Sequence, residues 1–281
     1  MKKRNSFIRV LTSRWTVLLS AIVILVFVLT AIFSKWITPY DPIGRDLVNR
    51  LAAPSAEHLL GCDLVGRDIL SRIIAGATTS LTIAVVSIVI SGVIGTVLGM
   101  IAGYFGGVLD TVIMRVNDAM MALPQIVLAL GIGVALGQST GNLMLAIGIS
   151  SAPAYIRMMR GATISEKERM YVTAGRVTGC SDAWIMFKHI LPNCLSPMIV
   201  TATMNLGGAI MAEASLSYLG LGIVPPTPAW GSMVSDGFSY IKSNPLLSIA
   251  PGVCIMIVVL AFNILGDGLR DMLDPRIRSS L

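Results

Sequence analysis

Charged residues are scarce in this chain: Asp, Glu, Lys and Arg together make up 13% of its 281 residues, whereas 54% are hydrophobic. In ordinary soluble domains roughly a quarter of the residues are charged. The shortage of charge therefore excludes an ordinary soluble domain, and the excess of apolar residues predicts a protein embedded in a membrane.

Metal-binding and redox side chains are also scarce. The two histidines, His58 and His189, fall on opposite sides of the membrane in the topology predicted below. The four cysteines are scattered without a C-x-x-C pair, and only Cys62 is predicted to face the oxidising side. The sequence therefore indicates neither a metal site nor an intrachain disulfide. No arrangement of Ser, Cys or His suggests a catalytic nucleophile, so we expect no catalytic residues.

Two further absences concern the energy source. The sequence has no G-x-x-x-x-G-K-S/T loop, so the chain cannot cradle ATP phosphates in that manner. It also lacks the ladder of acidic and histidine side chains that proton-coupled carriers often have across a membrane. We therefore expect no enzyme activity and no cofactor in this chain, and we place the energy source on another chain.

Long uncharged runs are what the sequence does contain. A bilayer-spanning helix needs about 20 apolar residues, and the long run in the middle of the chain has a turn signal at 137–142 that divides it into two spans. The sequence therefore predicts an all-α polytopic membrane protein with six transmembrane helices, near residues 15–34, 80–103, 118–136, 142–160, 196–221 and 246–266.

The basic residues orient these spans. With a cytoplasmic N-terminus, 15 of the 21 Lys and Arg residues fall on the inner side, so the positive-inside rule places both termini in the cytosol. The net charge of +6 is then explained by topology, and we expect no nucleic-acid partner. Three parts result: the cytoplasmic N-terminus with an uncleaved first span (1–34), an extracytoplasmic segment (35–79) and a five-helix core (80–281).

A polar stretch, 157–193, interrupts the apolar runs on the cytoplasmic side, and we expect two short helices in it. Ser165 with Glu168 three positions later is typical of a capping box, which predicts a first helix over 166–178. Met170, Ala174 and Val177 share one face of that helix. A cytosolic helical pair in a membrane protein indicates a contact with another molecule.

Glycine and proline define the remaining boundaries of this pair. Gly179 is expected to stop the first helix, because glycine tolerates the left-handed conformation of a C-terminal cap. Ser181 and Asp182 are expected to cap a second helix over 184–191, and Pro192 to end it.

The same stretch resembles the coupling loop of ABC importer permeases, in which Glu-Ala-Ala is followed after three residues by Gly and after nine more by Ile-x-Leu-Pro. This sequence departs from that pattern at Thr173, Gly175 and His189, and Thr173 removes the acidic contact of the family. The flanking strings are similar to the peptide and nickel importer branch. The residues that carry the resemblance are Tyr171, Val172, Thr173, Ala174, Gly175, Arg176, Gly179, His189, Ile190, Leu191, Pro192 and Asn193.

The resemblance implies a permease subunit in the cytoplasmic membrane of a prokaryote, with a coupling loop at 161–193 that docks in a cleft of a separate ATPase. It implies four kinds of partner: a homologous second permease, two ATP-binding subunits that carry ATP and Mg, an extracytoplasmic solute-binding protein, and membrane lipid. The cargo would be di- or oligopeptides. A nickel or metal-chelate importer stays open as an alternative, and so do an ion-coupled secondary carrier acting alone and a membrane scaffold without a pathway.

The outer segment contains a charged string that allows two interpretations. Asp63, Gly66, Arg67 and Asp68 could belong to a solvated connector, with the charged side chains in water. The string also resembles the peptide and nickel branch, which implies a segment that caps the outer mouth or meets a solute-binding protein.

Glu213 is the only acidic residue inside a predicted span. A carboxylate in lipid is costly, so it should face the bundle interior, a partner helix or water. Glu213 and nearby Ser217 are candidates for the translocation path, and a structural hydrogen bond to another helix is the alternative.

Three further patterns lead to expectations about packing and charge. Glycines recur every four residues at 95, 99, 103 and 107, which predicts a groove that lets another helix approach closely. Arg115 is expected to pair with Asp110 or Asp118 on one helical face. The C-terminal tail, 263–276, resembles the family and could brace the ATPase contact.

Overall fold

The computed structural model describes residues 15–273 of the chain. Within that range it contains helices and no strand, so the predicted all-α class is confirmed. The α-helices are α2 (Trp15–Ile37), α3 (Ile69–Phe105), α4 (Gly107–Met121), α5 (Gln125–Leu136), α6 (Thr140–Lys167), α7 (Met170–Val177), α8 (Asp182–Trp184), α9 (Leu191–Tyr218), α10 (Trp230–Phe238) and α11 (Leu246–Leu273), with a 3₁₀-helix η1 (Leu47–Asn49) and a π-helix η2 (Ile185–Ile190).

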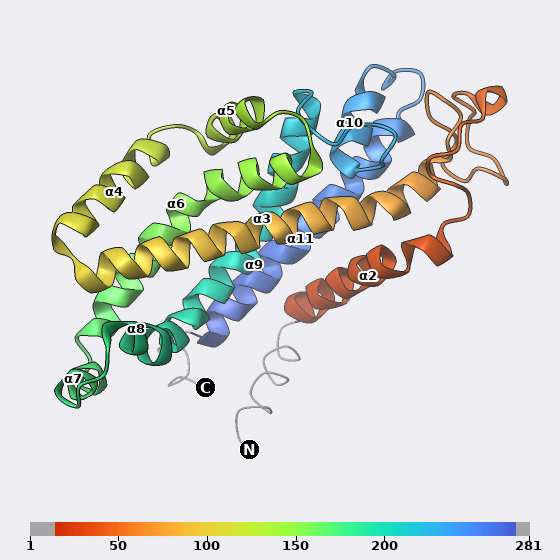
Figure 1. Cartoon of the computed structure of the whole chain (residues 1–281). Coiled ribbons are helices and arrows are strands. Elements are labelled where there is room, and N and C mark those ends of the chain that lie inside the picture. The colour runs from red at the N-terminus through yellow and green to blue at the C-terminus, as the bar shows by residue number, and fades with distance from the viewer. Residues whose placement is uncertain (1–14, 274–281) are drawn as a thin grey trace.

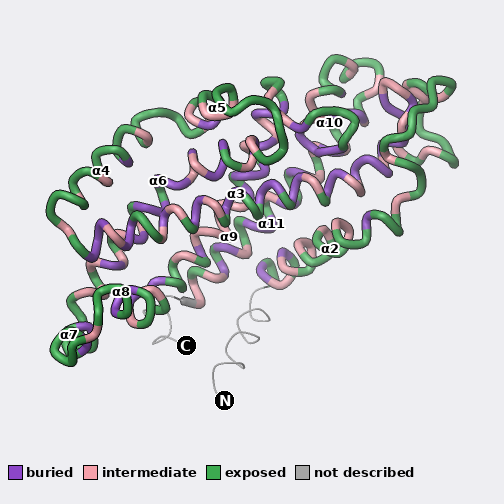
Figure 2. The backbone as a smooth tube through the Cα atoms, in the orientation of Figure 1, coloured by how far each residue is buried: buried purple, intermediate pink, exposed green. Residues whose placement is uncertain are grey.

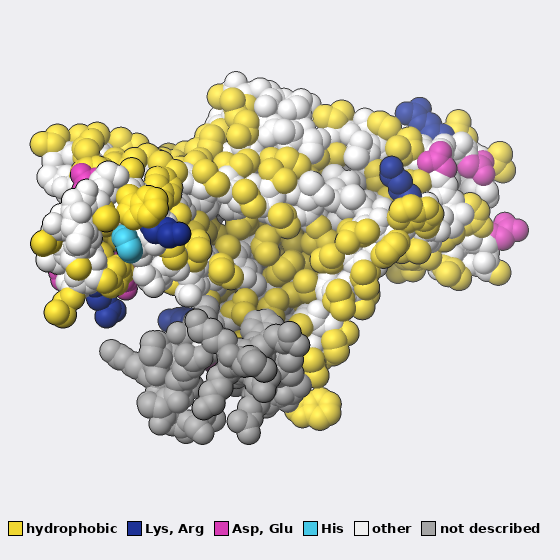
Figure 3. Space-filling model, turned by 60° about the horizontal axis from the view of Figure 1, so that its bottom comes forward, with side chains coloured by type: hydrophobic (Ala, Val, Ile, Leu, Met, Phe, Trp, Pro, Cys, Tyr) yellow, Lys and Arg dark blue, Asp and Glu magenta, His cyan; other side chains and the backbone are white. Residues whose placement is uncertain are grey.

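The long helices form an elongated bundle with two distinct ends (Figure 1). α3 packs along α6, and α2 packs against α3 and α11. α7 and α8 protrude at one end, whereas α10 and the segment between α2 and α3 lie at the other. On the face shown in Figure 3, charged side chains gather toward the two ends and a broad hydrophobic band lies between them. This distribution is the one expected of a bundle that spans a bilayer.

Four helical segments in the described range are long and apolar enough to cross a membrane: α2, α3, the continuous helix from Asp182 to Tyr218, and α11. They correspond to the first, second, fifth and sixth predicted spans. The second span begins at Ile69 rather than at residue 80, because the charged Arg72 in its first turn is buried and donates to the carbonyl oxygen of Pro42 at 2.8 Å. Charge at this position therefore did not mark a helix boundary.

The third and fourth predicted spans have a different form. The third, 118–136, is a bent pair in which α4 and α5 meet at 98°, so the prediction of one continuous helix from residue 118 was wrong. Pro124 precedes the first residue of α5 and cannot continue the helical hydrogen bonds of α4. The fourth, 142–160, lies inside α6, whose 28 residues are long enough to cross although it is more polar than the other spans.

The predicted glycine groove forms where α3 meets α6. A methyl group on Gly95 would lie 2.2 Å from Cβ of Tyr155, and one on Gly99 would lie 2.5 Å from the carbonyl oxygen of Ile156. Gly103 is equally close to α6. Gly107 was wrongly included: it has a φ of +57°, touches nothing within 4 Å and begins α4.

The buried core follows the helices that line this groove. Buried residues run along α3, α6, α9 and α11, whereas much of α4 is exposed (Figure 2). Trp230, at the start of α10, is fully buried and donates from Nε1 to the carbonyl oxygen of Ile73 at 2.9 Å. Its ring meets Phe27 of α2 edge-on, with centroids 5.5 Å apart, so α10 connects α2 and α3 at the end of the bundle opposite α7.

Ion pairs connect α4 to α6 rather than residues within α4. Asp110 accepts two hydrogen bonds from Arg160, at 2.5 and 2.7 Å, and Asp118 accepts one from Arg157 at 2.7 Å. The expected pairing of Arg115 with Asp110 or Asp118 was therefore wrong, because α6 lies beside α4 and presents two guanidinium groups. α11 continues through the predicted tail to Leu273, and residues 274–276 lie outside the described residues.

Candidate functional site

The predicted helical pair exists, but its first helix begins later than expected. α6 continues through Ser165 to Lys167, and α7 starts at Met170 after Arg169, which makes no side-chain cap. The predicted capping box of Ser165 and Glu168 was wrong, because α6 leaves the bundle without stopping and already satisfies the backbone there.

The end of α7 follows the prediction. Gly179 has a φ of +80°, and the N–H of Cys180 donates to the carbonyl oxygen of Gly175 at 3.0 Å. Ser181 then accepts from the N–H of Trp184 at 3.3 Å and caps α8. The glycine thus reverses the chain between two short helices.

The second helix does not end at Pro192, so that prediction was wrong. α8 passes into the π-helix η2 and directly into α9, so Pro192 follows the π-helical turn inside a longer helix. Local π-type adjustments of the backbone allow a membrane helix to continue past a proline. Residues 182–218 therefore form one continuous helix that is long and apolar enough to cross a membrane. We call α7 and α8 the coupling pair, after the family loop that they resemble.

The inner face of α7 packs against this continuous helix. Val172 is fully buried in a cluster with Ile185 and Ile190, and Leu191 packs against the same cluster. A methyl group on Gly175 would lie 3.7 Å from Ile185 and 4.0 Å from the His189 ring. Gly175 is therefore buried against the continuous helix and does not belong to the exposed side of α7.

The side of α7 that faces away from the bundle, which we call its outer face, is apolar and exposed. Met170 is 88% exposed and Val177 is 83% exposed, with Thr173 and Ala174 exposed between them. Apolar side chains on a protruding helix are costly in water and mark a protein contact when several adjoin. The predicted common face of Met170, Ala174 and Val177 is real, and it points away from the rest of the chain.

Hydrogen bonds hold the base of α7 in place. The Tyr171 hydroxyl donates to Glu166 Oε2 at 2.5 Å and accepts from Asn193 Nδ2 at 3.0 Å. Burial, together with the neighbouring Glu166, raises the pKa of Tyr171 to about 12, so the phenol keeps its proton and remains a donor. Its ring lies 6.1 Å from that of His189.

A second set of contacts joins the pair to α3, and our sequence analysis did not identify it. Tyr104, near the end of α3, donates to Asp182 at 2.5 Å and lies under the Arg176 guanidinium, 5.3 Å from the ring centroid. Lys167 donates to the carbonyl oxygen of Tyr104. The sequence does show an aromatic residue, Tyr104, directly after Gly103 of the glycine groove. It could not show the contact, because Asp182 is 78 positions away in the sequence.

Removing the Tyr104 hydroxyl should weaken this link without unfolding the chain. A hydrogen bond to a carboxylate contributes about 1.5–3 kcal/mol, so Tyr104→Phe is expected to lower the uptake obtained per ATP hydrolysed by about tenfold or more. Tyr218→Phe is the matched control, because its ring contact with Phe238 survives the change. Equal coupling in both variants would show that the Tyr104 hydroxyl does not connect α3 to the pair.

At the opposite end, the charged string of the outer segment is folded rather than solvated. Asp63 accepts from the N–H groups of Val65 and Arg67, at 2.9 and 3.0 Å. The same carboxylate accepts from Nε of Arg67 at 2.6 Å and lies 3.4 Å from Nε of Arg72. The interpretation of a connector with Arg67 in water was therefore wrong.

Asp68 and Gly66 complete this outer cap, which we define as residues 61–72. Asp68 is buried, caps α3 through the N–H of Ser71 at 2.7 Å and lies 3.0 Å from Nδ1 of His58. A methyl group on Gly66 would lie 1.5 Å from the carbonyl oxygen of Asp46. Cys62 is buried, and burial raises the pKa of its thiol to about 11, which makes it unreactive.

Glu213 lies inside the bundle, where it is 0% exposed. Its carboxylate accepts from Ser217 of the same helix at 2.9 Å and from Ser80 of α3 at 3.5 Å. A methyl group on Gly231 of α10 would lie 3.0 Å from both carboxylate oxygens. These contacts favour the structural hydrogen bond, the alternative that we left open, over a position on the translocation path.

A glutamine should therefore replace Glu213 with little effect. Its amide has nearly the same shape and can both accept and donate among these serine hydroxyls. Glu213→Gln is expected to keep assembly and uptake within about twofold, whereas Glu213→Ala leaves a cavity and costs about 2 kcal/mol or more of stability. Uptake and the amount of assembled importer are measured for both variants. Loss of uptake with normal assembly in Glu213→Gln would contradict the structural role and support a place for Glu213 on the translocation path.

Two sequence families match this chain. Residues 95–279 match the family described as "Binding-protein-dependent transport system inner membrane component". Residues 5–54 match the "N-terminal TM domain of oligopeptide transport permease C". The first match covers both the glycine groove and the coupling pair, and the second covers α2 and the start of the outer segment.

Individual relatives agree with these families. The glutathione transport system permease protein GsiD of Shigella flexneri is 44% identical over 92% of this chain and 86% of its own length. GsiD of Salmonella paratyphi A is 45% identical over 91% of this chain and 84% of its own length. A solved structure of the MetNI methionine ABC transporter, inward facing, shares the fold with a TM-score of 0.59 and 20% identity, covering 73% of this chain and 98% of that one.

The fold is thus that of a type I importer permease, and the resemblance noted in the sequence is confirmed. The chain belongs to the binding-protein-dependent transport system inner membrane components, and it is a multi-pass permease subunit of an ABC importer.

Proposed function

We propose that this chain forms half of a translocation pathway for di- or oligopeptides and is coupled to a separate ATPase through the loop at 161–193. The observation that carries the proposal is the apolar outer face of α7, which protrudes from the bundle on a base fixed by Val172 and Tyr171. An exposed apolar patch of this kind marks a site of interaction with another protein.

The physical route from this face into the membrane is short. α7 packs on η2, and η2 continues into α9 without a break, so a displacement of α7 is transmitted along one helix. Tyr104 transmits the same displacement to α3. ATP binding would close the ATPase pair around α7 and switch the pathway from inward- to outward-open, and hydrolysis would reverse the change.

Two observations support peptides as the cargo. The similar GsiD proteins carry the name of a glutathione transport system, and glutathione is a tripeptide-like molecule. The N-terminal residues match a domain of an oligopeptide permease. A nickel or metal-chelate importer is the second candidate, since a chelated metal needs no His or Cys cluster in the permease.

The same proposal gives the topology and the partners. The start of α2 and the end of α11 meet, since a methyl group on Gly268 would lie 2.8 Å from Val17, and both lie toward the end that carries α7 (Figure 1). That arrangement supports cytoplasmic termini. The outer cap at the other end would face the solute-binding protein, and a homologous permease would supply the second half of the path. ATP and Mg would be held by the two ATP-binding subunits.

Uptake in a strain that lacks this chain tests the proposal. Labelled glutathione, a dipeptide, a longer peptide and nickel are offered in parallel, with and without an intact ATPase subunit. We expect one peptide class to be lost and to be restored only when this chain and the ATPase are both supplied. Loss of nickel uptake alone would favour the second candidate, and uptake that persists without the ATPase would support the carrier hypothesis instead.

A further inference from the structure

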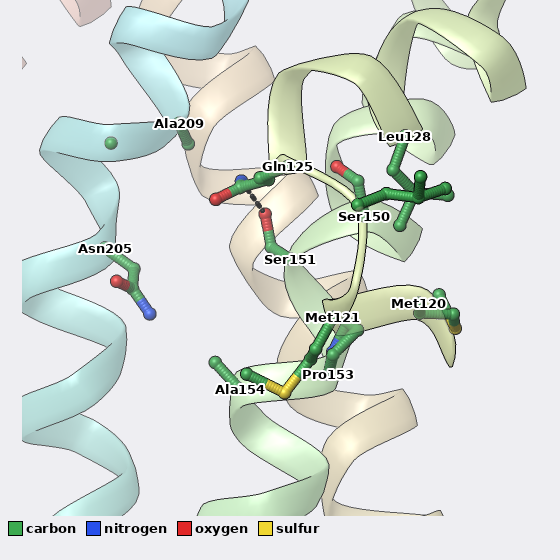
Figure 4. Close-up of a pocket in the computed structure, with 12 residues that line it drawn as sticks. Met120, Met121, Gln125, Leu128, Ser150, Ser151, Pro153, Ala154, Asn205 and Ala209 are labelled. Atoms are coloured by element: carbon green, nitrogen blue, oxygen red, sulfur yellow. Dashed lines mark hydrogen bonds between the residues drawn. The ribbon is translucent and has the colours of Figure 1, made fainter. Parts of the chain in front are cut away.

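A cavity of about 270 Å³ lies at the bend between α4 and α5. Met121 and Gln125 flank the bend on one side, and α6 and α9 form the other walls (Figure 4). The cavity is separate from the coupling pair and from the outer cap.

The cavity lies halfway along the helices that enclose it. On α6, Ser151 is near the middle of Thr140–Lys167, and on α9, Asn205 is near the middle of Leu191–Tyr218. In secondary transporters, discontinuous helices near the bilayer midplane form the substrate site, because their broken ends expose backbone and polar groups to the cargo, and the same physical argument applies to a broken helix here. The 98° bend between α4 and α5 is such a break.

The polar groups in the wall are uncharged. Gln125 Nε2 donates to Ser151 Oγ at 2.8 Å, and the Asn205 amide lies across the space from this pair (Figure 4). The side chains of Met120, Met121 and Leu128 supply most of the apolar part. Among the described residues that line the cavity none is acidic, basic, His or Cys, so it suits a ligand that offers amide donors and acceptors and not a bare cation.

The cavity is open and small for a complete ligand site. Sites for small molecules usually have volumes of about 300–1,000 Å³, and this one is just below that range. A methyl group on Gly208 would meet nothing within 4 Å, so the α9 wall faces free space. Both facts fit one half of a site whose other half comes from a second subunit.

We propose that this cavity is where the chain contacts the passing cargo, with the amides of Gln125 and Asn205 bonding the peptide backbone; the inference rests on the proposed peptide transport. Neutral amides form hydrogen bonds with the peptide bond, which every peptide shares, and they do not distinguish between the side chains of the peptide. The permease would therefore accept many sequences, and selectivity would lie with the solute-binding protein.

Two substitutions test the polar contacts in the complete importer. Gln125→Met and Asn205→Leu keep the approximate size but remove the amide, and each should lower peptide uptake about three- to tenfold, the effect of losing one neutral hydrogen bond. Thr203→Val is the matched control, because Thr203 lies on the same helix and bonds its own backbone at Ile199, 2.9 Å away. ATP hydrolysis stimulated by the binding protein should be unchanged in all three.

A cysteine in the cavity provides an independent measurement that does not depend on removing contacts. Gly208→Cys and Gly161→Cys both place the thiol in open space on a helix, but only Gly208 lines the cavity. Alkylation at each site is followed by mass spectrometry in the intact importer, with and without a transported peptide. We expect the peptide to slow alkylation at 208 several-fold and to leave 161 unaffected.

The outcomes separate this inference from the proposed function. Peptide uptake by the unmodified importer, without protection at 208 and without loss in the two amide variants, would overturn the cavity assignment and leave the proposed function in place. Absence of any peptide uptake by the unmodified importer would overturn the proposed function and this inference with it. Protection at 208 together with normal ATP hydrolysis in the amide variants supports both.

Discussion

An aspartate at position 174 is expected to abolish uptake while ATP hydrolysis continues. Ala174 lies on the exposed face of α7, between Met170 and Val177, so the substitution does not disturb the packing beneath it. Helix propensity changes by less than about 1 kcal/mol when Asp replaces Ala. Burying an unpaired carboxylate against a protein partner, in contrast, costs several kcal/mol, or about a hundredfold or more in the docking equilibrium.

Gly179→Asp is expected to uncouple the importer by a different route. A methyl group at Gly179 would meet nothing within 4 Å, so sterics with neighbours are not the cause. The φ of +80° is the cause, because an L-residue there costs about 1–2 kcal/mol and shifts the angle between α7 and α8. Asn tolerates this conformation best after Gly, so Gly179→Asn should be milder than Gly179→Val.

Uptake and ATP hydrolysis are measured together in the reconstituted importer. Ala174→Asn is the control for charge, since it has nearly the size of Asp and no charge, and we expect it to retain most of the coupling. Normal transport by both Ala174→Asp and Gly179→Asp would show that α7 does not dock on the ATPase. Equal loss in Ala174→Asp and Ala174→Asn would point to size rather than charge.

Local chemistry made the coupling pair partly predictable. Gly179 and Ser181 act through their own backbone and nearest neighbours, so their roles as stop and cap could be read directly. The start of α7 could not be predicted in this way, because it depends on how far α6 extends beyond the bilayer. The prediction that Pro192 ends a helix was wrong for a related reason: the π-helix η2 directly before it lets the helix continue, and no local sequence pattern marks α8, η2 and α9 as continuous.

Contacts that form only on folding explain the remaining errors. Solvated charges were one interpretation of Arg67 and Asp68, although their partners Asp63 and His58 are only four and ten residues away, because the sequence does not show how the outer segment folds back on the start of α3. Glu213 could be placed inside the bundle by the cost of its charge, but only the fold brings Ser80 to it. The cavity at Gln125 had no sequence signal, since it exists where α4 and α5 bend.

The substitution Gly95→Ala is expected to prevent stable assembly of the bundle, and this is the largest structural effect we predict. The added methyl group would lie 2.2 Å from Cβ of Tyr155 and 2.9 Å from its backbone carbonyl carbon. Tyr155 is fully buried, and backbone cannot rotate away as a side-chain end can. Relief therefore requires α3 and α6 to separate, and overpacking of this kind costs about 1–3 kcal/mol or more.

Separation of these helices would also remove the close contact on which their association depends. Membrane helices associate by packing rather than by the hydrophobic effect, because lipid is as apolar as the side chains. Gly99→Ala meets the carbonyl oxygen of Ile156 at 2.5 Å and should behave in the same way. The two variants test one contact at successive turns of α3, so they should fail together.

Gly131→Ala and Gly161→Ala are the matched controls, since in both the methyl group meets nothing within 4 Å. Replacing a helical glycine by alanine in open space should stabilise by about 0.5–1 kcal/mol. Thermal unfolding of the purified chain and the amount inserted in the membrane are the measurements. If Gly95→Ala behaved like Gly131→Ala, the α3–α6 contact would have to be looser than these distances, and a displacement of α3 would then reach α6 only weakly.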